Sequence, residues 1–599
     1  MGGSGSKTKG VWPFTSTGAT GETPGEVSEQ CLARLKGSKC GTPFIFTRRS
    51  SLYFDEDGDL AHEFYEETVV TKNGRKKAKL KRILKNLIPQ QTCVVLSPVT
   101  YDEVYMCNKS VCVKSRDSAV KGVIVNGEVM AYWFRSVWRI WLMVPLILDR
   151  LSIGQNMKAT RWPLHPHKPV VLIWNAPTED CRPRHNVHFQ LNQFQIVASP
   201  NEGLTKQNLT LFYRDRLGLY PYFKADGTSV NGGLPQTASL TEHLEKMPDG
   251  IEKYIRDPSA RGLAVIDWEE WRPLWMRNWD AKDIYKSQSL SQVAQKNPSW
   301  TSGKISKAAQ QEFEMSSRRF MRETLRLAKS LRPNQLWGFY LFPDCYNHDY
   351  RNSLENYTGR CPDVEVSRNN QLKWLWTEST ALFPSVYMSS VLRSTSSGRQ
   401  FVRNRVKEGM RLASDGEGLA RPIFIYTRPT YDNKLELLTE MDLVWTVGES
   451  VALGAAGIIF WGDSTWASTN ASCFSLNQYL EGPLGRYLLN VSTAAEQCSR
   501  FLCSWHGRCL RRHPDTDTYL HLDPDAHTVM GQGREMHVTG DLSADEQMRL
   551  KEDFQCQCYS GYQGERCDVE DPLQQRGEGH ALTALWVYSL TPVLLQMFV

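Results

Sequence analysis

GLAVIDWEEWRPLW, residues 262–275, is the most informative part of the sequence, because an apolar strand there leads directly into the acids Asp267, Glu269 and Glu270. Successive side chains of a strand point to opposite faces, so Asp267 and Glu269 share one side and Trp268 takes the other. Two close carboxyl groups do not both ionise easily, so one of them can keep its proton and act as an acid. A glycosidase needs such a pair. Two solvated acids at a strand end are the alternative that these residues leave open.

Similar apolar runs recur on both sides of this stretch. Longer segments with helical periodicity, 305–331 and 398–413, separate some of them. Buried strands that alternate with helices predict an α/β fold, a parallel barrel over residues 168–492 whose functional loops follow the strands. The other predicted strands are PVVLIW (169–174), NLTLFY (208–213), LWGFYLF (336–342), PIFIYT (422–427) and AAGIIFW (455–461).

The composition bounds the class of protein. The chain has 599 residues, of which 41% are hydrophobic and 23% charged, so it can form a large core and is not globally disordered. The net charge is 71 − 65 = +6. That value is small for this length and argues against a nucleic-acid partner.

Ten of the 15 cysteines lie between residues 181 and 567. An even, crowded set favours disulfides and an oxidising compartment. Zinc is the alternative, but paired CxxC spacing is missing, so we predict neither a metal nor a cofactor. Four N-x-S/T sequons in the same part of the chain favour secretion and glycosylation, at Asn208, Asn356, Asn470 and Asn490.

The C-terminal part carries two further patterns. CQCYSGYQGERC (556–567) is typical of the end of an EGF-like domain, and we predict such a module over 498–568. Its spacing from Cys509 to Cys556 is too long for a standard domain and predicts an inserted loop. The apolar tail 577–599 is typical of a GPI-attachment signal, with a retained transmembrane tail as the alternative.

The N-terminal residues differ in character, and they are expected to form an irregular, partly disordered region. MGGSGSK fits N-myristoylation at Gly2, with a flexible tail as the alternative. The basic run 72–85 would serve as a second membrane anchor or as a solvated charged surface. In the acidic run 55–67, four residues match EF-hand ligand positions, but the sixth position is Leu60 where a glycine is needed. Those four are Asp55, Asp57, Asp59 and Glu66.

Residues 130–155 resemble a signal peptide, with Arg135 and Arg139 before the apolar run IWLMVPLIL. An internal buried helix is the alternative. A signal peptide is unexpected so far into a chain. We therefore expect a joined or read-through product in which Met130 starts the second part and 91–129 is an unassigned linker.

Two families resemble parts of this chain. Residues 1–90 resemble tumour suppressor candidate 2, a family of small myristoylated proteins, in MGGSGSK, FIFTRRSS and FDEDGDLAHEFYEETVVTKNGRKKAKLKR. Residues 168–567 resemble family 56 hyaluronidases. The matching motifs are FYRDRLGLYP (212–221), GLAVIDWEEWRPLW, WGFYLFPDCYNHDY (337–350), YTGRCP (357–362), ALFPSVYM (381–388), GESVALGAAGIIFWGD (448–463) and CSWHGRC (503–509).

The second resemblance implies a distorted (β/α) barrel with an EGF-like module, and it implies roles for particular residues. Glu269 would be the general acid/base, and Asp267 would orient the substrate's N-acetyl group, whose oxygen is the nucleophile. Tyr340 and Tyr387 would hold that group. Tyr213, Arg405 and Trp461 would line the cleft, with Arg405 near a glucuronate charge; ordinary core or surface packing is the alternative for each. Gly462-Asp463 departs from the secreted relatives and is expected to alter substrate grip.

The resemblance also implies disulfide pairs and partners. The substrate would be hyaluronan, with chondroitin as an alternative, and the GPI-like tail would anchor the enzyme at the cell surface, with the lysosome as a second location. A surface receptor with little turnover is the rival function. The N-terminal segment alone indicates a cytosolic membrane face instead. The implied pairs are Cys181–Cys473, Cys345–Cys361, Cys498–Cys509, Cys503–Cys556 and Cys558–Cys567.

Overall fold

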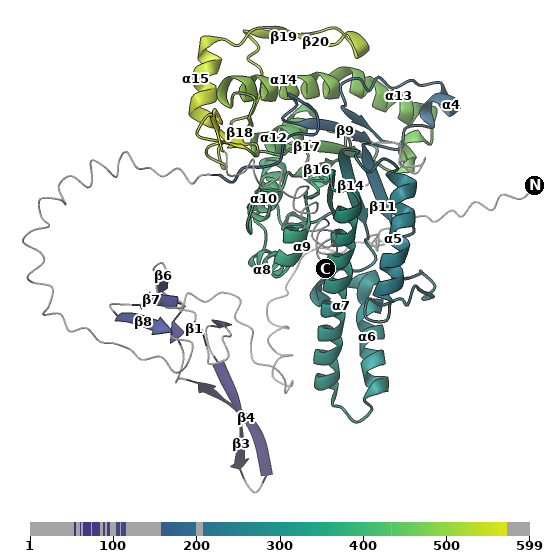
Figure 1. The fold of residues 1–599 in the computed structure, drawn as a ribbon, viewed down its shortest axis with the longest axis vertical. Helices are drawn as coiled ribbons and strands as arrows, with labels where there is room; N and C mark the ends of the chain where they lie inside the picture. Colours follow the sequence, from purple (N-terminus) through teal and green to yellow (C-terminus); the bar gives the residue numbers. More distant parts are fainter. Residues whose placement is uncertain are drawn as a thin grey trace, which may run out of the picture. The chain divides into compact units, whose positions relative to one another are not determined.

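The computed structural model describes residues 157–198, 208–432 and 434–571, together with eight short strands between residues 53 and 114. Residues 1–152 and 153–599 form two compact units (Figure 1). Gly2, the signal-like segment 130–155 and the tail 577–599 lie outside the described residues, so those expectations remain predictions.

The first unit contains antiparallel strands where the sequence predicted irregular structure. β3 (Phe64–Lys72) pairs with β4 (Arg75–Ile83), so the acidic and basic runs form one hairpin. The residues between them are Asn-Gly, the strongest two-residue hairpin signal. Glu66 lies inside β3, whereas the last EF-hand ligand belongs next to a helix. The other strands are β1 (Tyr53–Phe54), β2 (Leu60–Ala61), β5 (Ile88–Pro89), β6 (Cys93–Val95), β7 (Glu103–Cys107) and β8 (Ser110–Lys114).

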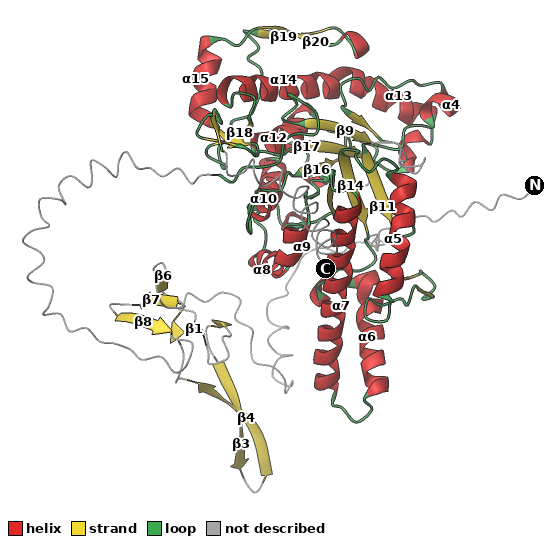
Figure 2. Ribbon diagram, in the orientation of Figure 1, coloured by secondary structure: helices red, strands yellow, loops and turns green. Residues whose placement is uncertain are grey.

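Parallel strands organise the second unit (Figure 2). One sheet has the order β10-β9-β17-β16 and another β11-β14-β15. The segment 382–385 joins them through isolated bridges to β16, and a Tyr340–Phe383 bridge connects it to the end of β15. We call this run of strands, with its helices, the barrel. The strands are β9 (Val171–Asn175), β10 (Ile196–Val197), β11 (Leu209–Tyr213), β14 (Gly262–Asp267), β15 (Gln335–Phe339), β16 (Phe424–Thr427) and β17 (Gly457–Trp461).

Each of the six predicted apolar runs overlaps an observed strand, and the ends differ by at most three residues. Helices flank them, and the two long predicted helices are present as α7 (Ser302–Leu331) and α10 (Ser396–Ala413). Thr301 and Thr395 start these helices, because each hydroxyl accepts a hydrogen bond from the first-turn backbone. The other barrel elements are α4 (Cys181–His185), β12 (Tyr222–Phe223), β13 (Ser229–Val230), α5 (Leu240–Tyr254), α6 (Asp283–Lys296), α8 (Asp363–Gln371), α9 (Lys373–Glu378), α11 (Glu440–Leu443), α12 (Glu449–Ala452) and α13 (Asn470–Tyr479).

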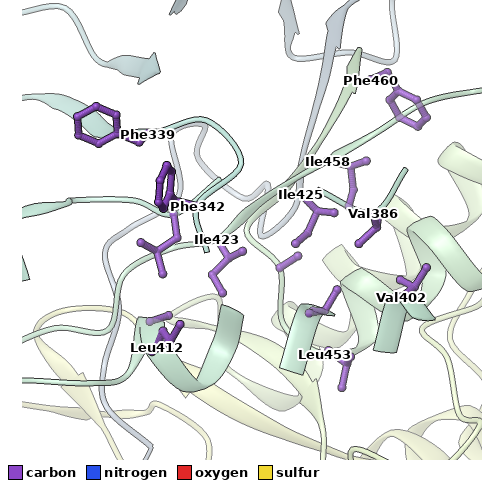
Figure 3. Close-up of a cluster of buried hydrophobic side chains, with 14 of the residues drawn as sticks. Phe339, Phe342, Val386, Val402, Leu412, Ile423, Ile425, Leu453, Ile458 and Phe460 are labelled. Carbon is purple, nitrogen blue, oxygen red and sulfur yellow. The ribbon is translucent and has the colours of Figure 1, made fainter. Parts of the chain in front are cut away.

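The core has two layers because strand side chains alternate. Val171, Ile173 and Val265 belong to the cluster inside the barrel. The opposite faces pack against the helices in a second, larger cluster (Figure 3). Asp267 lies two residues beyond Val265 on the same strand, so the period of two directs it to the carboxyl end of the barrel interior.

The cysteine-rich segment continues directly from the barrel. α14 (Gly485–Leu502) crosses the predicted boundary near 492–498, and Cys498 lies within it. β18 (Gly507–Arg511) pairs with β21 (Phe554–Cys558), and the long insertion lies between them. The remaining elements are β19 (His527–Met530), β20 (His537–Gly540), α15 (Ala544–Asp553), β22 (Tyr562–Gln563) and β23 (Val569–Glu570).

Five disulfides connect these parts, in the five pairs that the resemblance implies. The Cys181–Cys473 bond spans 292 residues and ties the beginning of the barrel to α13. A cross-link that closes so long a loop stabilises a fold by about 5–6 kcal/mol in the chain-entropy account. None of the described helices combines the length and the apolar character that a membrane span requires. The other pairs are Cys345–Cys361, Cys498–Cys509, Cys503–Cys556 and Cys558–Cys567.

Candidate active site

The predicted site residues gather at the carboxyl ends of the barrel strands, which we call the mouth. Asp267 ends β14 and pairs in register with Tyr213, the last residue of β11. Tyr340 follows β15, and its backbone NH donates to Ile266 at 2.9 Å. Trp461 ends β17. Parallel strands bring their carboxyl ends to one edge, which is where barrel enzymes place their chemistry.

The three acids at the end of β14 have different environments. The pKa of Asp267 is raised well above its usual range by removal from water, and next by the charges of Glu269 and Glu270. Glu270 forms an ion pair with Arg214 at 2.8 Å. The side chain of Glu269 is 39% exposed, and its nearest cation is 3.4 Å away. Glu269 is therefore the acid with an accessible carboxyl group, and Asp267 is the one held neutral.

Two cations fix the position of Glu269. Arg272 Nη1 donates to the Glu269 carbonyl oxygen at 3.3 Å, and Nη2 lies 3.4 Å from Glu269 Oε2. The Lys282 ammonium donates to the same carbonyl oxygen. Burial, followed by the charge of Arg272, lowers the pKa of Lys282 to about 8. Trp268 points the other way and stacks on Tyr220 with centroids 4.4 Å apart, as the strand period predicts.

The two tyrosines predicted to hold an acetamido group are in contact. Their hydroxyls lie 2.6 Å apart. Burial raises the pKa of both Tyr340 and Tyr387, and nearby Glu269 and Asp267 raise it further. Both phenols therefore remain protonated and can donate hydrogen bonds. The Tyr387 ring also lies 5.9 Å from the ring of Trp461.

Arg405 reaches the site from α10, but its hydrogen-bonding groups are occupied. Its Nε donates to the Ser385 carbonyl at 2.7 Å, Nη1 to Asn347 at 3.2 Å and Nη2 to Asp344 at 2.7 Å. Asp344 is held ionised despite its burial, because the charge of Arg405 lowers its pKa to about 2. In this arrangement Arg405 braces the segment after β15, and its contacts are with the protein.

Several mouth residues were missed in the sequence. Arg272 and Lys282 were overlooked because their partner is a backbone carbonyl, which no side-chain motif reveals. Arg428 directly follows β16, and its guanidinium carbon lies 4.5 Å from the Trp461 centroid and 5.1 Å from that of Tyr387. Asn175 ends β9 and is fully buried. The signal for the last two was their position at the end of a predicted strand.

The mouth also contains buried polar atoms without hydrogen bonds: both amide atoms of Asn175, the Tyr426 hydroxyl and Arg428 Nε. Native proteins leave few such atoms, and each needs an explanation; a role in binding or catalysis is one that fits atoms at the carboxyl ends of barrel strands. Within the described ranges no cluster of three or more His, Cys, Asp or Glu side chains could hold a metal ion. The mouth residues named above present carboxyl, phenol, guanidinium, ammonium and amide groups.

Known proteins resemble both parts of the chain. Residues 159–571 match the family described as Hyaluronidase, and residues 1–104 match Tumour suppressor candidate 2. Hyaluronidase-2 from Homo sapiens is 50% identical over 445 residues, covering 74% of this chain and 94% of the relative. Rattus norvegicus hyaluronidase-2 is 49% identical over 432 residues, covering 71% and 91%.

A solved structure of bee venom hyaluronidase, in complex with a hyaluronic acid tetramer, is 29% identical. It covers 53% of this chain and 98% of its own, with a TM-score of 0.45. The match over residues 159–571 spans more than half of the chain, and the pair of acids at the end of β14 lies inside it. The chain therefore belongs to the hyaluronidase family and is a glycoside hydrolase.

Proposed function

We propose that this enzyme cleaves the β-1,4 N-acetylglucosaminide bonds of hyaluronan inside the polymer, with retention of configuration and with the substrate's own acetamido oxygen as nucleophile. The observation that carries the proposal is the unequal pair at the end of β14. One acid is removed from water and beside like charge, and the other is 39% exposed. Environments that separate two carboxyl groups in this way assign them different roles.

Glu269 is the proton carrier in this proposal. It donates its proton to the glycosidic oxygen as the C–O bond breaks, and it later takes a proton from the water that attacks the anomeric carbon. Both transfers need a carboxyl group that the substrate can reach and that does not swing away. Its exposure meets the first need, and the contacts of Arg272 and Lys282 with its backbone meet the second.

Asp267 acts on the acetamido group. As the carbonyl oxygen of that group attacks the anomeric carbon, positive charge develops on the amide nitrogen. A neighbouring carboxyl that accepts the N–H hydrogen bond, and that releases its own proton to water as the positive charge grows, becomes the counter-charge that favours this transition state. Tyr340 and Tyr387 hold two protonated phenols at the same mouth, where they can orient the acetamido oxygen.

Hyaluronan chain length is the measurement that tests this function. Wild type is expected to shorten the polymer. Glu269→Gln keeps the shape but cannot transfer the proton, and it is expected to lose about 10²- to 10⁴-fold in rate. Binding of hyaluronan by wild type without any shortening, from acidic to neutral pH, would replace this function with that of a receptor. Equal cleavage by both proteins would contradict the role of Glu269. Desulfated chondroitin in parallel tests the second substrate.

We also propose that the barrel is made in the secretory pathway and displayed at the cell surface by a GPI anchor, with residues 498–568 as an EGF-like module. Five disulfides support an oxidising compartment. Asn208, Asn356 and Asn470 are exposed, as glycosylation requires, and Asn490 is half-buried. Endoglycosidase should lower the mass only if the barrel was translocated, and phosphatidylinositol-specific phospholipase C should release it from cells. Peptide mapping of the mature N-terminus would show whether residues 1–129 accompany the barrel.

A further inference from the structure

The mouth contains two buried arginines with very different surroundings. Arg405 makes three hydrogen bonds of 2.7 to 3.2 Å with protein acceptors. Arg428 has long contacts only with its acids: its Nη1 lies 3.7 Å from Asp432 Oδ1 and 3.9 Å from Asp463 Oδ2. Separations of that length are ion pairs without hydrogen bonds. Arg428 Nε is buried and makes none either.

The contacts of Arg428 determine how its guanidinium is oriented in the mouth. The side chain is 8% exposed, and its flat face lies against the rings of Trp461 and Tyr387. Its Nη1 end faces two carboxylates whose side chains are 33% and 43% exposed. The guanidinium is therefore packed on its face and reachable at its tip, where an incoming carboxylate would meet it.

Asp463 is held where it is by its own turn. Its Oδ1 accepts a hydrogen bond from the Thr465 backbone NH at 3.0 Å, and its side chain caps the short helix that follows Trp461. Only the other oxygen, Oδ2, faces Arg428. Asp463 thus neutralises the arginine from a distance without taking its hydrogen bonds, which a ligand can still accept.

We propose that Arg428 is the specificity-determining cation of the cleft: it binds the carboxylate of a uronic acid unit beside Trp461, and Asp463 is the counter-ion that this carboxylate displaces. The inference rests on the proposed function and names the part of the substrate that the same site recognises. A guanidinium that exchanges long contacts for a charge-assisted hydrogen bond gains discrimination against neutral polymers. The proposal also gives Gly462-Asp463 a function: Asp463 competes with the substrate carboxylate for Arg428 and so lowers the affinity for substrate.

Binding can be measured without turnover in the Glu269→Gln background. The two ligands are a hyaluronan oligosaccharide and its carboxyl-reduced form, in which each glucuronate is a neutral glucose and the N-acetylglucosamine units are unchanged. We expect the charged ligand to bind about 10- to 100-fold more tightly, as a charged hydrogen bond implies. Adding R428Q should abolish that preference by weakening only the charged ligand, and R428K should restore part of it. R326Q, which changes an exposed arginine of α7 shortly before β15 begins, should leave both affinities unchanged.

A second variant tests the counter-ion. Asp463→Asn keeps the oxygen that caps the turn and removes the charge, so hyaluronan oligosaccharide should bind about 2- to 5-fold more tightly, with the neutral ligand unaffected. Weakening of both ligands equally by R428Q would overturn the proposal, since it would mean that Arg428 only supports Trp461 and Tyr387. Weaker hyaluronan binding by Asp463→Asn would overturn the counter-ion role. The proposed function is tested separately: it would fail if the wild type bound these ligands but did not cleave hyaluronan.

Discussion

Two regions of the barrel contain buried arginines and acids, and the hydrogen bonding of these side chains differs between the two regions. At the seam between the barrel and the cysteine-rich segment, Glu449 of α12 accepts from Arg403 of α10 at 2.6 Å and from Arg511 of β18 at 2.5 Å. The three side chains are at most 3% exposed. At the mouth, Asp267 is held neutral, Arg428 has only distant acids, and Asn175 and the Tyr426 hydroxyl have no hydrogen bonds.

The seam satisfies its charges almost completely. The terminal nitrogens of Arg403 also donate to the Asp515 carbonyl at 2.7 Å and the Thr516 carbonyl at 2.8 Å. Those of Arg511 donate to the Pro514 and Thr518 carbonyls. Buried charge is tolerated only with such partners. At the mouth, by contrast, the acids near Arg428 lie 3.7 and 3.9 Å away and accept no hydrogen bond from it, so its terminal nitrogens can still bind substrate. A buried Nε without a hydrogen bond occurs in both regions, at Arg511 and at Arg428, so the contrast lies in the short ion pairs of the seam.

The largest expected effect is at the seam. Glu449→Gln removes the negative charge that two buried guanidinium groups share. Arg403 keeps its ion pair with Asp517, and Arg511 is left with neutral acceptors. Breaking a buried ionic network of this kind costs about 3–5 kcal/mol. The free energy of unfolding in urea, measured with the disulfides intact, checks this value. A loss below about 1 kcal/mol would show that water reaches the seam and would weaken the comparison.

At the mouth, Asp267→Asn should separate activity from stability. Hyaluronan cleavage should fall about 10²- to 10³-fold, because the substitution removes the carboxyl group that stabilises the positive charge developing on the acetamido nitrogen. Stability should change in the opposite direction. The raised pKa of Asp267 means that the folded state keeps a proton that the unfolded chain releases above its ordinary value of 3.8. Wild-type stability therefore falls as the pH rises above about 3.8, and the variant lacks this loss.

The measurement for that prediction is urea unfolding of both proteins near pH 3.5 and at pH 7. The variant should be the more stable protein at pH 7, and the difference should shrink at the lower pH. A difference of the same size at both values would mean that the substitution acts through packing, and that the proton on Asp267 has no part in it.

A smaller effect is expected from single hydroxyls. Tyr340→Phe removes one partner of the 2.6 Å contact and leaves the Tyr387 hydroxyl unpaired, so it should cost about 1 kcal/mol of stability and lower the cleavage rate. Tyr426→Phe is the matched control, because that buried hydroxyl makes no hydrogen bond. Its loss should leave stability unchanged or raise it. Thermal unfolding of the two variants side by side distinguishes them, and equal losses would contradict the assignment.

The sequence predicted the strands of the barrel well, because a buried strand needs a continuous apolar run and few other elements produce one. It also predicted that Asp267 and Glu269 lie on one side, from the period of two; β14 itself ends at Asp267, so for Glu269 this stays a prediction. The resemblance to a family supplied the tyrosines and the disulfide pairs. The hairpin of β3 and β4 was missed because the charged composition of both runs obscured the Asn-Gly between them.

Other features depend on tertiary distance, which local pattern does not contain. At the mouth, Arg405 makes short hydrogen bonds with the protein and Arg428 does not. The acceptors of Arg405 lie 20 to 61 residues away from it in sequence, so a local pattern does not distinguish the two arginines. The boundary between the barrel and the cysteine-rich segment was expected near residue 495, but α14 runs through it. Apolar periodicity in a helix continues across such a boundary whenever both sides share one core, so composition alone does not locate a division there.

The smallest expected effect is at the exposed rim of the seam, where a surface ion pair can be compared directly with the buried pair beside it. Lys407 and Asp515 form an ion pair of 2.8 Å, close to the Arg403–Glu449 pair, with side chains 36% and 77% exposed. Such a pair gains little because water and salt already screen both charges, so Lys407→Ala should cost about 0–1 kcal/mol. Urea unfolding at low and high salt checks it. If Lys407→Ala were as damaging as Glu449→Gln, the stability of the seam would come from the docked backbone of residues 514–518, and saturation of buried charge would not explain it.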